Sequence, residues 1–250
     1  MSRRLVAVTI HMLASAAVAL VSALIVFVVW YPPPYAAVAG GISLFTILIS
    51  ADLILGPVLT AVVAAPEKTR QILRRDILVI AAFQLTGLAY GLHAIATSRP
   101  VFLAFEVDRM RVVTAADVDV ETLNEAPAEY RELPWTGPLL IATLRPTKPD
   151  EVVRAVELAM NGFDISTMPR YWRSYASQRE LVWQAARPVN ELIGKYPESA
   201  AEVRRIAAAT GQPVAGLRFM PLLSRHASWV TLLAPNESRI LGYLPYEGFF

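Results

Sequence analysis

Side chains that could carry out catalysis or bind a metal are few and widely separated in this sequence. There is no cysteine, which excludes a thiolate metal site and a thiol nucleophile. The three histidines, His11, His93 and His226, show no H-x-x-x-H or carboxylate-rich spacing, so packed or interfacial histidines are favoured over a metal site. No G-x-S-x-G, P-loop or G-x-G-x-x-G motif is present. We therefore expect no catalytic residue, metal or cofactor, and predict that the protein is not an enzyme.

One pair of carboxylates could still do acid–base chemistry. Glu106 and Asp108 are two residues apart on a presumed strand, which places them on the same face. Arg109 and Arg111 have the same spacing on the opposite face. Alternating charges of this kind are more common on a strand face that meets water, and this interpretation is favoured.

Asp52 has the least ordinary setting of any charged residue, because it lies near the middle of a long apolar stretch. An ionised carboxylate there costs roughly 2.5–3.5 kcal/mol on insertion scales. Gly56 and Pro57 follow within two turns, and the proline is expected to kink a helix. Asp52 could pair with Gln84 at similar depth, could receive a polar or cationic group of another membrane protein, or could belong to a proton path. The first two alternatives are equally favoured, since no chain of ionisable residues supports the third.

Three apolar stretches dominate the first 97 residues and account for the positive mean hydropathy of the chain, +0.43. They span 5–30, 36–65 and 77–97, and Asp52 is the only charged residue within them. About 20 apolar residues cross the hydrocarbon of a membrane, and a spanning segment of this length is helical. A cleaved signal peptide is the alternative for the first stretch, but its apolar run is too long. The sequence therefore predicts a three-helix transmembrane domain over residues 1–97.

Basic residues flank these stretches unevenly. Arg3 and Arg4 precede the first, and four more lie between the second and third, whereas the loop at 31–35 holds none. The positive-inside rule then predicts a cytoplasmic N-terminus and places everything after Thr97 on the far side of the membrane. The aromatic residues around the uncharged loop are expected at the outer interface: Trp30, Tyr31 and Tyr35.

Residues 98–250 hold most of the charged residues and read as a separate extracytoplasmic domain. Short β-rich runs predict strands, and apolar residues at helical spacing predict helices, with Pro188 kinking or splitting one of them. The expected strands are 101–107, 110–114, 138–144, 217–223, 228–234 and 239–244, of which the first two form either a tight hairpin or one bulged strand. The expected helices are 150–161, 177–196 and 197–210. Strands followed by helices and more strands predict an α+β domain with a mostly antiparallel sheet.

A set of motifs recurs in the order seen in one known family. They are Asp52–Thr60 (D-x-x-L-G-P-x-L-T), Arg75-Asp76, Tyr90-Gly91, Arg99–Val101, Phe105–Arg109 and Leu133–Pro138. With these motifs, the chain resembles over nearly its whole length the type IV pilin accessory proteins of the TfpX/TfpZ type, some of which are called FimB.

The resemblance implies a bacterial inner-membrane protein with a periplasmic C-terminal domain. Its expected role is non-enzymatic and chaperone-like: it binds the major type IV pilin and supports pilin stability or pilus assembly. The lipid bilayer and other pilus assembly proteins are further expected partners, and nucleic acid is not. A membrane-bound enzyme that modifies the pilin, or a membrane sensor with an outer ligand-binding domain, are the alternatives.

Two groups of residues are expected to bind the partner. In the spans, these are Asp52, Gly56, Pro57 and Gln84, where small and polar residues suit helix association. In the outer domain, they are aromatic residues of the kind enriched at binding hot spots: Trp135, Tyr171, Trp172 and Tyr175. For any single one of these aromatic residues, a place in the domain core or rim is the more common alternative.

Overall fold

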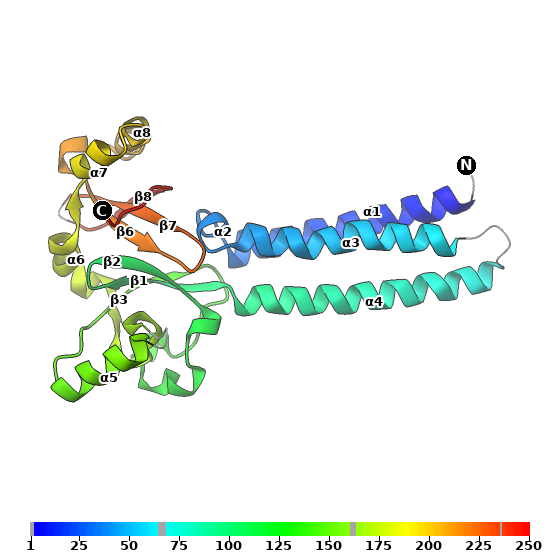
Figure 1. Ribbon diagram of the computed structural model, residues 1–250, viewed down its shortest axis with the longest axis horizontal. Coiled ribbons are helices and arrows are strands. Elements are labelled where there is room, and N and C mark those ends of the chain that lie inside the picture. Colours follow the sequence, from blue (N-terminus) through cyan, green and yellow to red (C-terminus); the bar gives the residue numbers. More distant parts are fainter. Residues whose placement is uncertain (1–2, 65–68, 161–163, 236) are drawn as a thin grey trace. The chain divides into compact units, whose positions relative to one another are not determined.

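The computed structural model describes residues 3–64, 69–160, 164–235 and 237–250, and it divides into two compact units, Met1–Ser98 and Arg99–Phe250. The first unit contains helices, and the second combines helices with a sheet (Figure 1). Three apolar helices followed by an α+β unit is the fold class predicted from the sequence, and it is confirmed.

Three helices of the first unit are long and apolar enough to cross a membrane. They are α1 (Arg3–Leu24), which continues as a π-helical turn over Ile25–Trp30, α3 (Gly41–Val63) and α4 (Arg70–Thr97). The second begins later than expected, because a separate short helix, α2 (Tyr35–Val38), comes before it. Gly40 then takes a φ of 77°, a left-handed conformation that separates the two helices and suits glycine.

Tyr31 does not form the interfacial belt expected of it. Its side chain is completely buried, and its hydroxyl donates a hydrogen bond to the carbonyl oxygen of Ile95 at 3.2 Å. Gly41 allows this position, because a Cβ there would lie 2.6 Å from the tyrosine ring. Tyr35 is also buried. The expectation was wrong for both residues, because a ring in an interfacial belt faces the lipid, whereas these two rings are enclosed.

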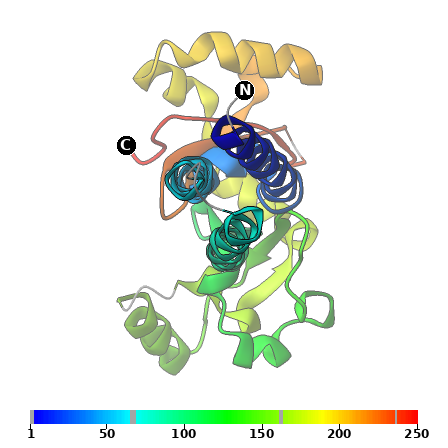
Figure 2. The same cartoon turned by 90° about the vertical axis from the view of Figure 1, so that its right-hand side faces the viewer.

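Figure 2 shows the three long helices end-on, and α3 packs along both α1 and α4, whereas α1 and α4 approach each other little. Close packing against α4 depends on Gly91, where a Cβ would run into the side chain of Leu48. A small residue at such a position lets two helices approach closely.

The second unit is built on one sheet. Its strands are β1 (Pro100–Glu106), β2 (Arg109–Thr114), β3 (Leu139–Thr143), β4 (Trp172–Ser174), β5 (Arg187–Pro188), β6 (Arg218–Leu223), β7 (Ser228–Leu233) and β8 (Ile240–Leu244). The order is β4-β3-β1-β2-β6-β7-β8, with β5 paired to β6 outside this path. Only the β1–β3 and β2–β6 pairings are parallel among the described strands, so the sheet is mostly antiparallel as predicted.

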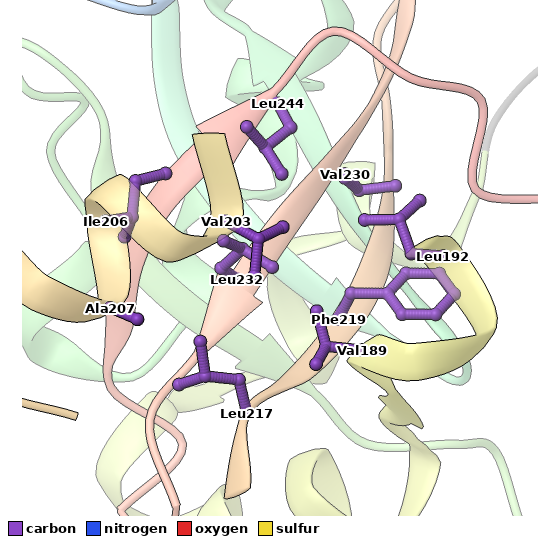
Figure 3. Packing of buried hydrophobic residues seen from close by; sticks show 10 residues of the cluster. All are labelled: Val189, Leu192, Val203, Ile206, Ala207, Leu217, Phe219, Val230, Leu232 and Leu244. Carbon is purple, nitrogen blue, oxygen red and sulfur yellow. The ribbon is translucent and has the colours of Figure 1, made fainter. Parts of the chain in front are cut away.

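Helices α7 (Val189–Lys195) and α8 (Ser199–Thr210) cover part of this sheet. Their apolar residues meet side chains of β6, β7 and β8 in a buried cluster of ten residues (Figure 3). Pro188 does split the expected helix over 177–196, because α6 (Arg179–Ala185) ends before it and α7 begins after it. In helix α5 (Pro149–Met160), all three valines are exposed.

Candidate functional site

The motif of the second span lies at the middle of α3, and its glycine has a definite steric role. Gly56 is buried, and a Cβ on it would lie 2.6 Å from Nε2 of His11 on α1 and would run into the side-chain amide of Gln84 on α4. Glycine at this position therefore lets two polar side chains from the outer helices meet against the surface of α3. Pro57, the next residue, is also buried within the helix.

A chain of hydrogen bonds passes through this point and joins all three long helices. Nε2 of His11 lies 2.7 Å from Oε1 of Gln84, and the amide nitrogen of Gln84 donates to the main-chain carbonyl of Asp52 at 3.1 Å. On the other side of the imidazole, Nδ1 of His11 lies 2.9 Å from the hydroxyl of Thr60, which is completely buried.

These contacts assign the tautomer of His11. Because the nitrogen of Gln84 donates to a carbonyl, its oxygen is the acceptor that faces the imidazole, so Nε2 of His11 carries the proton. Nδ1 of a neutral imidazole then accepts, and the hydroxyl of Thr60 donates to it. A neutral ring satisfies every one of these contacts, which suits an apolar bundle where a charge is costly.

A pairing with Gln84 was one of the two favoured interpretations of Asp52, and the structure brings these two residues together in a different way. Gln84 binds the main-chain oxygen of Asp52, and not its carboxylate. His11 and Thr60 were not recognised as members of the network. The sequence does contain a signal for Thr60, because Gly56 and Thr60 are four residues apart and so share a helix face.

A groove opens between α1 and α4 over this network. Its cavity measures about 480 Å³, and its walls are mostly apolar and small side chains. The lining residues are Val6, Ala7, Ile10, His11, Ala14, Ser15 and Val18 of α1, Asp52 of α3, and Ile77, Ala81, Gln84, Leu85 and Leu88 of α4. The side chain of Asp52 is half-buried here, and no hydrogen bond or ion pair joins its carboxylate to another residue in the described part of the chain.

In the second unit, two of the four aromatic candidates are core residues. Trp172 is completely buried, donates its indole N–H to the carbonyl of Ser166 at 2.8 Å, and lies 4.5 Å from the ring of Phe102. Tyr175 is buried and donates to the carbonyl of Ser238 at 2.6 Å, and burial raises the pKa of its phenol. Because both rings are buried, neither is available to a partner. The prediction that Trp172 and Tyr175 bind a partner is therefore corrected.

The other two aromatic candidates are accessible. Tyr171 is half-buried and helps to line a cavity of about 470 Å³ next to α5. Trp135 is 63% exposed, and the guanidinium of Arg99 lies 4.2 Å from the centre of its ring. Arg99 also donates through Nε to the carbonyl of Pro134 at 3.2 Å, so two motifs that are far apart in the sequence meet here.

The two acidic residues considered for acid–base chemistry serve separate structural purposes. The buried carboxylate of Glu106 accepts a hydrogen bond from the backbone N–H of Ser166 at 3.2 Å. Asp108 is exposed in the turn between β1 and β2 and forms an ion pair with Arg109 at 2.9 Å. Arg111 pairs with Asp164, and burial lowers the pKa of its guanidinium.

The chain is similar to known proteins of pilus biogenesis. A family described as "Fimbrial assembly protein FimB" matches residues 1–40. Two fimbrial assembly proteins of Dichelobacter nodosus, of serogroups I and E1, are 33% and 32% identical to it over 231 residues. Each alignment covers 91% of this chain and 89% of the relative. No solved structure matches. The chain therefore belongs to the FimB family of fimbrial assembly proteins.

Proposed function

We propose that the protein is a non-enzymatic accessory protein of the bacterial inner membrane that binds the major type IV pilin and supports its stability or its assembly into pili. Membership of the fimbrial assembly family supports the role in pilus assembly. In this proposal the N-terminus is cytoplasmic, and the second unit is periplasmic, as the basic residues near the apolar helices favour.

The groove between α1 and α4 is the observation that carries the proposal. Its α1 wall runs from Val6 to Val18, which is about 18 Å along a helix axis at ~1.5 Å per residue. That length matches several turns of a single apolar helix. The small side chains of Ala7, Ala14 and Ser15 would let such a helix approach closely.

Asp52 gives the groove its chemical preference. An intramembrane carboxylate is costly by about 2.5–3.5 kcal/mol unless it finds a partner, and the described residues do not provide one. A hydrogen-bond donor or a cation on an incoming helix would reduce that cost. The His11–Gln84 bond lies beside it and fixes the floor of the groove.

A matched pair of substitutions on α1 tests this proposal. Ala14 lines the groove, whereas Ala16 is exposed two residues later, about 200° around the helix. Ala14→Phe should fill the groove and reduce the pilin that co-purifies with the tagged protein from native membranes. Ala16→Phe adds the same ring to the other face and should leave co-purification unchanged. Equal recovery of pilin with both variants would contradict the proposal.

A further inference from the structure

A second surface on the molecule points to a lipid contact that does not depend on the pilin. It is the exposed apolar segment that precedes and begins β3, and we call it the Trp135 segment, residues 134–140. Trp135 is 63% exposed, Leu139 45% and Leu140 36%. The first two residues of β3 are therefore open, whereas its last three are buried.

The contacts of this segment keep it near Arg99, the first residue of the second unit. Arg99 follows Thr97, the last residue of α4, by only two positions, and its side chain holds Trp135 directly. Strand register gives the same result, because Leu139 pairs with Phe102, three residues or about 10 Å of extended chain after Arg99. The segment cannot lie far from the point at which the chain leaves α4.

The arrangement at Arg99 is built to hold the indole in place. Arg99 itself is buried, with 7% of its surface exposed, so its guanidinium is not the group presented to solvent. It supports Trp135 from one side through a cation–π contact at 4.2 Å and fixes the neighbouring backbone through Pro134. The indole is thus held in an exposed position by a buried charge.

We propose that the Trp135 segment lies in the headgroup region of the bilayer and anchors the second unit to it. Tryptophan is enriched at this depth, because its ring is apolar while its N–H can donate to lipid oxygens. Two of the three aromatic residues expected at the outer interface, Tyr31 and Tyr35, are buried and do not take this role. Leu139 and Leu140 add apolar area beside the indole.

The absence of cysteine allows a clean test with single labels. The full chain is placed in lipid nanodiscs with a bimane fluorophore on Thr136→Cys, next to Trp135, or on Asp108→Cys. Asp108 is exposed in the turn that follows β1, and this strand rises about 20 Å from Pro100 to Glu106. Lipids that carry a nitroxide on the headgroup should quench the label at position 136 strongly and the label at 108 weakly. Equal quenching at the two positions would overturn the proposal.

A pair of tryptophan substitutions separates anchoring from mere proximity. Trp183 forms a similar stack with Arg218, at 4.4 Å, elsewhere in the same unit. In the Thr136→Cys protein, Trp135→Ala should cause a loss of headgroup quenching, and Trp183→Ala should cause none. Unchanged quenching after Trp135→Ala would show that the indole is no anchor. Shielding of position 136 from a water-soluble quencher without any lipid quenching would indicate a protein contact instead, and would also overturn the proposal.

Discussion

The imidazole of His11 and the amide of Gln84 are joined by a 2.7 Å hydrogen bond that connects α1 to α4 across the surface of Gly56. These two helices approach each other little elsewhere, and each packs mainly on α3. This polar bridge therefore spans the floor of the groove. This arrangement explains why the α3 motif has a glycine at position 56, where a larger residue would meet the side chains that form the bridge.

Gly56 should not tolerate a methyl group. Gly56→Ala places a Cβ against the side-chain ends of His11 and Gln84, which must shift and so weaken hydrogen bonds between the helices that contribute about 0.6 kcal/mol each on average and up to ~1.7. Gly87→Ala on α4 is the matched control, since a Cβ there meets nothing within 4 Å, and alanine favours a helix by up to ~1 kcal/mol. Thermal unfolding in detergent should show a lower midpoint for the first variant and an equal or higher midpoint for the second. A fully stable Gly56→Ala protein would mean that the three helices meet differently.

The bond between His11 and Gln84 should appear as a coupling in a double-mutant cycle. Interhelical hydrogen bonds in membranes contribute about 0.6 kcal/mol on average and up to ~1.7. His11→Leu and Gln84→Leu should each lower the free energy of unfolding. The double variant should lose less of this free energy than the sum of the two single losses. Strict additivity would show that the two side chains do not interact.

Asp52→Leu distinguishes the role of the main-chain carbonyl of this residue from the role of its carboxylate. Gln84 binds the carbonyl oxygen, which the substitution keeps, so the helix network should persist. Loss of an insertion cost of about 2.5–3.5 kcal/mol should leave the protein at least as abundant in membranes. Co-purified pilin should nevertheless decrease, and Asp52→Asn serves as the variant of equal size without charge. A protein level that falls together with pilin binding would assign the carboxylate a structural role.

The orientation of the chain can be checked with two reporters that are active only outside the cytoplasm. A reporter fused after Phe250 should be active, and one inserted at Thr69, in the basic loop before α4, should be silent. Activity at Thr69 would rule out an outward second unit on three spans.

The sequence was sufficient to predict the parts of the fold that depend on long, regular patterns. Three apolar runs predict the helices, and short runs rich in β-branched and aromatic residues predict strands such as β1, β2, β6 and β7. The break at Pro188 could be predicted too, because proline lacks the N–H that continues a helix.

The details that depend on tertiary contacts could not be predicted in this way. Burial of Tyr31 requires the loop to fold back until its hydroxyl reaches Ile95, and nothing local to residues 31–35 specifies that. Similarly, Gln84 could have bonded to the main-chain oxygen or to the carboxylate of Asp52. The similar depth of the two residues in the membrane does not distinguish these alternatives. Trp172 and Trp135 are of the same residue type, and only the folded sheet decides that one is core and the other is exposed.

Crosslinking from α4 tests the groove most directly. Leu85 lines the groove, and Phe83, two residues earlier on the other side of the helix, is 78% exposed outside it. A photoreactive phenylalanine analogue is placed at either position in cells that produce the pilin, and the products are identified by mass spectrometry. We expect a covalent adduct with the membrane helix of the pilin from position 85 and none from position 83. Adducts from position 83 but not from 85, or adducts from neither, would contradict a pilin helix in this groove.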